Sequence, residues 1–239
     1  FGANPRQISL DQTAFLLGTE AEGGTRRIGL VKGKIEIEVD QPAPNVVRVL
    51  TRLTSQAEEA SAGFKQASTY TIYGNTALGI DLQIQCFGSL PPRPRLGLTL
   101  SLPEGFETFA WLGRGPLESY NDRKAGQPVG LYISTVDDQY VPYVMPQEHG
   151  NKTDVRWVAL RRADGIGLLV MGEPLFEASA SHFTADDLYQ AMHTNELVRR
   201  QEVILNLDVR QSGLGGASCG PATLDPYLVH PGEFRLKLQ

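Results

Sequence analysis

The chain has 239 residues, of which 41% are hydrophobic and 21% charged, so it is long enough to bury a sizeable core and has the composition of a folded globular protein. Its 27 acidic residues outnumber 22 basic ones, and no segment gathers lysine and arginine into a stripe, which argues against nucleic acid as a partner. The longest apolar run, residues 166–171, is far below the roughly 20 residues of a membrane-spanning helix, so we expect no membrane partner either.

The cysteines indicate the cellular compartment of the protein, and the first residues indicate whether the chain is part of a longer polypeptide. Two cysteines, Cys86 and Cys219, are few for a disulfide scaffold and favour a reducing, cytoplasmic compartment. The chain opens on Phe1 without an initiator Met or a signal region, which predicts a piece of a longer polypeptide. Neither a metal site nor a cofactor is predicted, because no phosphate-binding glycine loop is present and the histidines are scattered, at His149, His182, His193 and His230.

In chain order, the dominant pattern is period-two alternation, which places every second side chain on one face of a strand. It begins with Ile35, Ile37 and Val39, which alternate with charged residues and predict one buried stripe. The alternation returns at residues 80–86, 96–102, 203–209 and 234–238. Turn pairs predict bends between strands, at Lys32-Gly33, Gly74-Asn75, Asp164-Gly165 and Pro231-Gly232.

One segment predicts a helix, which Thr184 would cap and which would run over residues 185–192 with acidic residues in its first turn. Residues 55–63 resemble a linker but are short enough for a hairpin loop. A dozen or so strands with almost no helix must hide their apolar faces against one another, so we expect an all-β antiparallel sandwich. A single domain over residues 1–239 is the leading interpretation, and two smaller sandwiches in tandem are the alternative.

The first dense cluster of unusual residues is the segment 111–124. Glu118 and Asp122 are candidates for the carboxylate pair of a glycosidase, which a retaining mechanism needs about 5 Å apart. Arg114, Arg123 and Lys124 lie close enough in sequence to neutralise both acids. The cluster therefore favours a packed loop over a catalytic pair.

The second cluster is the segment 140–154. Glu148 beside His149 suggests an acid/base pair, but adjacent residues of an extended segment point to opposite faces, so a hydrogen-bonded loop is favoured. Asn151-Lys152-Thr153 matches a glycosylation acceptor, a triplet that is common by chance.

The third cluster is the glycine-rich segment 212–221. Residues 216–220 match the esterase pattern around Ser218, yet no helical period follows, and Asp225 and His230 are the only realistic downstream partners. Glycines let the backbone approach a ligand or another domain closely, with the Cys219 thiol as the projecting group. Cys86, in contrast, lies on the apolar face of a predicted strand and is expected to fill the core.

Together the three clusters resemble the last domain, or small chain, of the large bacterial glycoside hydrolase family 2 β-galactosidases. The motifs that carry the resemblance are Trp111-Leu112-Gly113-x-Gly115-Pro116-x-Glu118-x-Tyr120-x-Asp122-Arg123, Tyr143-Val144-x-Pro146-Gln147-Glu148-x-Gly150 and Gly213-Leu214-Gly215-Gly216 before Cys219. The segment from Ser181 to Leu188 is similar too. The resemblance implies an antiparallel supersandwich like that of galactose mutarotase.

The resemblance also implies that the catalytic glutamates belong to a separate (β/α)₈ barrel, so no residue of this chain is catalytic and the chain alone is inactive. It places Cys219 where the best-known members carry an aromatic residue against which the sugar stacks, although other members are similar in having Ser-Cys-Gly-Pro, so Cys219, Ser218 and Gly220 are the expected substrate-binding residues. Two departures are His149, where Asn is common, and the absence of the usual Arg-Ala-Pro-x-Asp-Asn-Asp stretch.

The function expected from the resemblance is hydrolysis of terminal β-galactosides by an intact enzyme in which this chain closes one wall of the galactoside site and supports assembly. Its partners would be the remaining β-galactosidase domains or a large subunit, and homo-oligomerisation is left open. One rival is an independent carbohydrate-binding module or a mutarotase-like epimerase. Another is a docking domain without a ligand.

Overall fold

A computed structural model describes residues 20–21, 24–25, 30–57, 61–216 and 220–239, with side chains from residue 35 on. The strands are β1 (Glu20–Ala21), β2 (Gly24–Thr25), β3 (Leu30–Ala43), β4 (Val46–Ala57), β5 (Gly63–Tyr73), β6 (Leu78–Phe87), β7 (Arg95–Leu102), β8 (Thr108–Arg114), β9 (Val129–Thr135), β10 (Lys152–Arg161), β11 (Gly167–Ser181), β12 (Val203–Gln211) and β13 (Glu233–Leu238). The helices are α1 (Ala185–Gln190) and the short 3₁₀ segments Asp137–Gln139, Thr194–Glu196 and Asp225–Tyr227.

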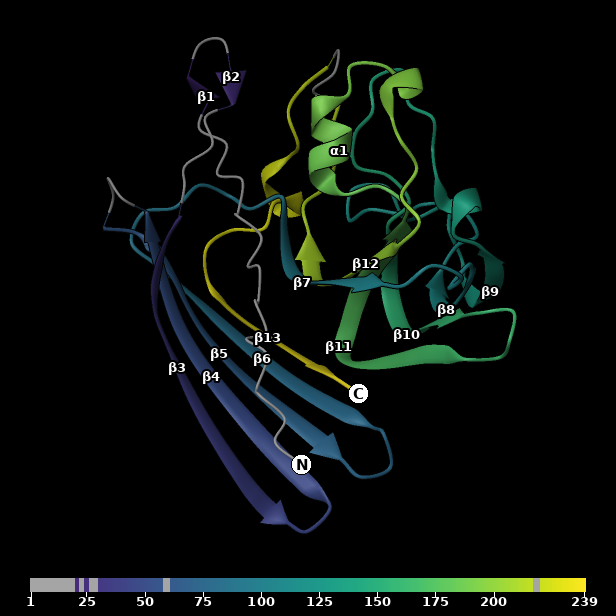
Figure 1. Ribbon diagram of the computed structural model, residues 1–239. Coiled ribbons are helices and arrows are strands. Elements are labelled where there is room, and N and C mark those ends of the chain that lie inside the picture. Colours follow the sequence, from purple (N-terminus) through teal and green to yellow (C-terminus); the bar gives the residue numbers. More distant parts are fainter. Residues whose placement is uncertain (1–19, 22–23, 26–29, 58–60, 217–219) are drawn as a thin grey trace.

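The strands form two layers joined by β11 (Figure 1). The first layer has the order β3-β4-β5-β6-β13, and the second has the order β7-β12-β11-β10-β8-β9. Every pairing is antiparallel. Since β11 pairs with β13 at Gly172 and Glu173 and with β10 and β12 elsewhere, one long strand belongs to both layers. The predicted all-β antiparallel sandwich is confirmed.

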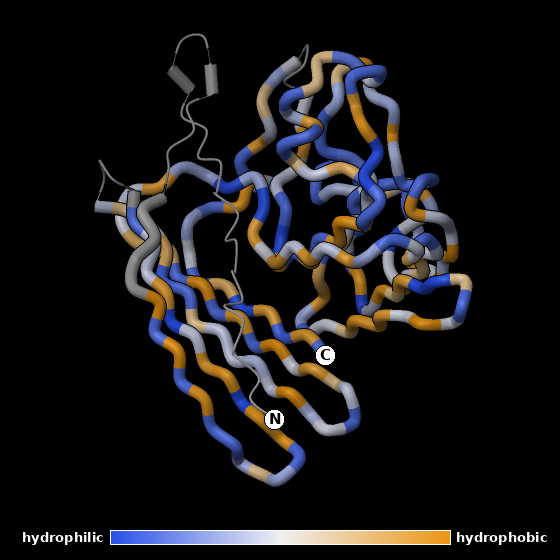
Figure 2. Tube along the Cα trace, in the orientation of Figure 1, coloured by the Kyte–Doolittle hydropathy of each residue, from blue (hydrophilic) through white to orange (hydrophobic). Residues whose placement is uncertain are grey.

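The core lies between the layers, where the inward side chains of both meet. Leu82 and Leu236 of the first layer are 1% and 0% exposed, and Trp111 and Val158 of the second are 1% exposed. Polar and apolar residues alternate along the strands (Figure 2), which is the pattern the sequence predicts. Cys86 packs against this core, as expected.

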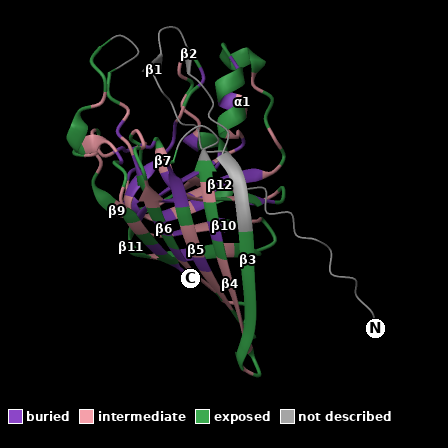
Figure 3. Ribbon diagram, turned by 90° about the vertical axis from the view of Figure 1, so that its left-hand side faces the viewer, coloured by how far each residue is buried: buried purple, intermediate pink, exposed green. Residues whose placement is uncertain are grey.

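Two expectations for β3 are wrong. Lys32-Gly33 forms no turn, because β3 continues through both residues with a shift in register between Lys32 and Ile35. The stripe Ile35, Ile37 and Val39 is not buried, since these side chains are 38%, 60% and 66% exposed. β3 is the outermost strand of its layer, and Figure 3 shows it largely exposed. Alternation reveals which side chains share a face but not whether another layer covers that face.

The predicted helix is present, and two of the four predicted turn pairs join neighbouring strands. Thr184 caps α1, because Asp187 N donates to Thr184 Oγ1 at 3.1 Å and Thr184 N donates to Asp187 Oδ2 at 2.8 Å. The helix ends at Gln190, two residues earlier than predicted. Tight turns join β5 to β6 at Gly74-Asn75 and β10 to β11 at Asp164-Gly165, where Gly165 has a φ of 88°. No helix among the described residues has the length and apolarity to cross a membrane.

Candidate functional site

The first two sequence clusters meet on the outer face of the second layer, over β7, β12 and the end of β11. Two asparagine amides from these clusters hold Glu177 of β11: Asn121 Nδ2 donates to Oε1 and Asn151 Nδ2 donates to Oε2, both at 2.8 Å. Asn121 Nδ2 also lies 2.8 Å from the carbonyl oxygen of Gln211, the last residue of β12. Loop side chains thus bind strand residues on the face of the layer that points away from the core.

The third cluster is fixed by Asp122. We call residues 212–223 the glycine loop; the amides of Leu214 and Gly215 donate to the Asp122 carboxylate at 3.2 and 2.7 Å. The carboxylate packs so closely on Gly213 that a Cβ there would lie 2.7 Å from both of its oxygens. Gly215 has a φ of 61°, a conformation that favours glycine. The base of the glycine loop is therefore built around one carboxylate.

Glu118 links the first cluster to the second. It pairs with Arg123, accepts from the Tyr143 hydroxyl and accepts from the amide of Gly150 at 2.9 Å. Glu118 and Asp122 both hold loops, as the favoured interpretation of the first cluster requires.

The expected cations are only partly correct. Arg123 does pair with Glu118, but Arg114 Nε and Lys124 Nζ contact Asp154, at 2.5 and 3.1 Å. Asp154 lies 30 residues or more beyond them in sequence, so local spacing could not reveal it. Asp122 instead binds backbone amides, which leave no trace in residue type.

The second cluster is a hydrogen-bonded loop rather than an acid/base pair. Glu148 contacts Arg95 of β7 at 3.2 Å, and Arg95 Nε donates to Asp208 of β12 at 3.1 Å. His149 is 5% exposed and packs edge-on against the Tyr140 ring, with a centroid distance of 5.0 Å. Asn151 is 0% exposed, so the glycosylation reading of its triplet is wrong.

Two buried groups of this network have shifted pKa values. Burial raises the pKa of Glu177 to about 7, although the amides of Asn151 and Asn121 oppose the shift. Burial lowers the pKa of Lys152 to about 8; its ammonium lies 4.8 Å from the centroid of the Trp111 ring and donates to the Pro116 carbonyl at 3.2 Å. Both residues are enclosed by the fold, at 6% and 1% exposed, so neither presents its charge at the surface.

Of the expected substrate-binding residues, Cys219 and Ser218 lie outside the described residues, and Gly220 is exposed. The described residues of the glycine loop next to them, Gly215 and Gly216, are exposed as well. His230 Nε2 and Asp225 Oδ1 lie 3.2 Å apart at the surface.

One cluster escaped sequence reasoning because its members lie far apart in the chain. Glu107, Asp137 and His182 offer ligand atoms within 4.8 Å of one another. Arg199 already supplies a cation there, since its guanidinium contacts Glu107 at 3.2 Å, Asp137 at 2.8 Å and His182 Nε2 at 2.8 Å. Its residues fit an arginine-centred ion cluster that ties the segment after α1 to the loop before β8.

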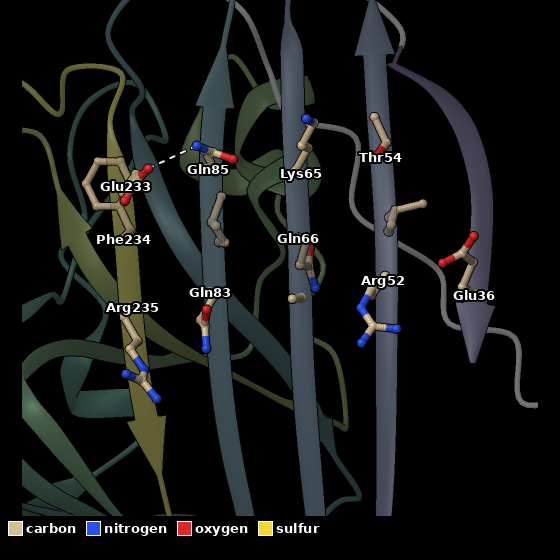
Figure 4. A pocket seen from close by; sticks show the side chains of 13 residues that line it. Glu36, Arg52, Thr54, Lys65, Gln66, Gln83, Gln85, Glu233, Phe234 and Arg235 are labelled. Atoms are coloured by element: carbon tan, nitrogen blue, oxygen red, sulfur yellow. Dashed lines mark hydrogen bonds between the residues drawn. The ribbon is translucent and has the colours of Figure 1, made fainter. Parts of the chain in front are cut away.

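A polar groove of about 730 Å³ lies on the outer face of the first layer (Figure 4). Neighbouring strands supply its side chains in register: Arg52, Gln83 and Arg235 share one row, and Lys65, Gln85 and Glu233 share the next. Gln85 donates to Glu233 at 2.9 Å, as drawn in Figure 4, and Arg235 pairs with Asp81 at the edge of the groove. This second surface offers hydrogen-bonding groups suited to a polar ligand.

Comparison with known proteins identifies the family. A family model described as "Beta galactosidase small chain" matches residues 19–239. The β-galactosidase of Vibrio cholerae serotype O1 is 37% identical over 170 residues, which are 71% of this chain and 16% of that protein. The β-galactosidase of Kluyveromyces lactis is 34% identical over 180 residues, or 73% of this chain and 17% of that protein.

Among solved structures, a GalM/aldose epimerase homologue from C. elegans overlaps 84% of this chain and 66% of its own, with 15% identity and a TM-score of 0.41. This TM-score is too low to carry an inference. The chain spans about one sixth of the length of the curated relatives, so most of their polypeptide has no counterpart here. The family match covers nearly all of the residues described above, and the chain belongs to the β-galactosidase small-chain family.

Proposed function

We propose that this chain is the carboxy-terminal part of an enzyme that hydrolyses terminal β-galactosides, and that its glycine loop lines the galactoside site with Cys219, Ser218 and Gly220. The catalytic carboxylates of a retaining mechanism belong to the part of the enzyme outside this chain. The observation that carries the proposal is the anchoring of Leu214 and Gly215 by Asp122, because it connects the family's first and third motifs at the root of that loop.

Support also comes from what the other carboxylates do. Glu118 and Glu177 accept hydrogen bonds from neighbouring loops, and Asp208 is paired with Arg95. These three carboxyl groups contact other parts of this chain and are largely buried, so they do not present a catalytic pair to solvent. We therefore expect this chain alone to be inactive; robust turnover of a chromogenic galactoside by the isolated chain would refute the proposal.

The decisive variant is Asp122→Ala in the intact enzyme, assayed with a chromogenic galactoside. Displacing the glycine loop by an ångström or so should lower kcat/KM about 100-fold. The matched control is Asp40→Ala, which removes a carboxylate that pairs with Arg48 on the exposed edge of the first layer. Equal kinetics for both variants would refute the role of the loop.

A second variant separates a site-lining loop from a docking domain without a ligand. Cys219→Trp adds a large ring to the glycine loop. If the loop lines the site, KM for the galactoside changes, whereas unchanged kinetics in the intact enzyme would favour the docking domain.

An independent sugar-binding module remains the alternative, and the polar groove is the observation that favours it. Arg52, Gln83 and Gln85 offer donors of the kind that bind sugar hydroxyls. Calorimetry with galactose tests this function: saturable heat that Gln83→Ala abolishes would support it. The His182–Glu107 pair does not support the epimerase form, because His182 is 2% exposed and its Nε2 already contacts Arg199.

A further inference from the structure

The outer face of the second layer carries a patch of apolar side chains that no described part of the chain covers. Cross-strand register places them in two adjacent rows, one residue from each of four strands. One row is Leu131, Leu112, Trp157 and Met171, and the other is Ile133, Ala110, Ala159 and Leu169. We call these eight residues the apolar patch.

The patch is open and uncharged. Ile133 and Leu131 on β9 are 71% and 62% exposed, and Leu169 and Met171 on β11 are 54% and 46% exposed. Neighbouring strands lie about 4.8 Å apart, so four strands make the patch roughly 15 Å wide. An apolar area of this kind, without a charge at its centre, is typical of a permanent interface.

The outer face of the first layer differs in its chemistry from the apolar patch. The outer face of β4, β5, β6 and β13 carries charged and amide side chains, among them Arg52, Lys65, Gln83 and Arg235. On the second layer the equivalent positions of four adjacent strands carry none. The contrast indicates that the apolar patch is built for a contact.

The edge strand of the second layer, β9, also supports a contact at this face. β9 pairs with β8 on one side, and in the described part of the chain no strand pairs with its other side. A long apolar edge strand left open invites aggregation, so proteins cover such strands or place charges on them. Val129, Leu131 and Ile133 alternate along β9 and place no charge on its outer face.

We propose that the apolar patch is the surface on which the rest of the β-galactosidase polypeptide packs. This inference rests on the proposed function, because it needs the other domains. The occupant is argued from length: the chain accounts for 16% and 17% of the two relatives described above, so about five sixths of each lies outside it. A permanent neighbour of that size matches an apolar face better than a transient, polar partner does.

The three methionines of the chain provide the test in the intact enzyme. Met171 lies in the patch, whereas Met145 and Met192 lie elsewhere, and the three are 46%, 49% and 56% exposed in this chain. Dilute hydrogen peroxide converts accessible methionine to its sulfoxide, which mass spectrometry counts at each site. If the patch is covered, Met171 should react about tenfold more slowly than Met192, although the chain alone exposes both to a similar degree.

Two variants sharpen the result. Ile133→Glu puts a charge into the contact and should raise the oxidation rate of Met171 toward that of Met192. Val198→Glu is the control, because Val198 is 81% exposed on the segment after α1 and should leave Met171 protected. Equal oxidation of Met171 and Met192 in the wild-type enzyme overturns the proposal. Protection that disappears when the enzyme is diluted into single intact chains also overturns it, since a second copy would then be the occupant.

The galactoside assay on the same samples keeps the two proposals apart. An enzyme that hydrolyses the galactoside while Met171 reacts freely retains the proposed function and loses the apolar patch. A protein that protects Met171 but does not hydrolyse galactosides retains the contact and loses the proposed function.

Discussion

The outer face of the second layer has two halves that are covered in different ways. Over β7, β12 and the end of β11 the strands present Glu177 and Asp208; two loop asparagines of the same chain hold Glu177, and Arg95 of β7 pairs with Asp208. Over β8, β9, β10 and the start of β11 the strands present the apolar patch, which the described chain leaves open. The chain completes its polar half with its own side chains, whereas we propose that another part of the polypeptide covers its apolar half.

If this comparison is right, substitutions in the polar half should destabilise the chain itself. The largest effect is expected for Asp208→Ala, which leaves Arg95 without its nearest carboxylate in a largely buried site and should cost about 4 kcal/mol in the free energy of unfolding. Asp81→Ala is the matched control, because Asp81 also pairs with an arginine across strands, but at the surface, and should cost about 0.5 kcal/mol. Denaturant titration measures both values, and similar losses would contradict the comparison.

The next effect concerns pH. The folded-state pKa of Glu177 is about 7, above its ordinary value of 4.5. A raised carboxyl pKa contributes stability that is complete below the ordinary value and is lost as pH rises through about 7, a change of about 3 kcal/mol. Glu177→Gln removes this titration, so the unfolding free energy of the variant should fall less than that of the wild type between about pH 5 and about pH 8. Parallel curves for the two proteins would show that Glu177 does not titrate in this range.

A feature of the polar half could be predicted where neighbouring residues in the sequence determine it. Alternation predicted the strands, and the Thr184 cap predicted α1, because both are local patterns. The clusters 111–124 and 140–154 were correctly interpreted as loops held by their own contacts rather than as catalytic pairs. Their partners were not predictable, since Asp122 binds backbone amides and Glu177 meets asparagines 26 and 56 residues away. Residues 217–219 of the glycine loop lie outside the described residues, so the assignment of Cys219 stays a prediction.

A smaller effect is expected at the glycine loop. Gly213→Ala brings a Cβ against both oxygens of Asp122 and should cost about 2 kcal/mol, because the carboxylate must move away from the amides that it holds. Gly216→Ala is the control, since the nearest atom to its Cβ would be 3.6 Å away. Thermal unfolding should separate the two variants, and equal midpoints would indicate that the packing at Asp122 yields easily.

The smallest change in the free energy of unfolding is expected in the apolar patch. Ile133→Lys in this chain should change the unfolding free energy by less than about 0.5 kcal/mol, because the side chain is largely exposed. The same substitution in the intact enzyme should have a larger effect, since it would bury a charge. A large loss in the chain alone would mean that the apolar patch stabilises this domain rather than a contact with another.

The course of β11 gives these two halves a mechanical connection. Leu169 and Met171 lie near its start, and Glu177 lies six residues beyond Met171 on the same continuous strand. Between them, Gly172 and Glu173 pair with β13 and fasten the strand to the first layer. A domain packed on Leu169 and Met171 would therefore also stabilise the far end of β11, where Asn121 and Asn151 bind Glu177. A shift of β11 by one residue would disturb the apolar patch and these hydrogen bonds together.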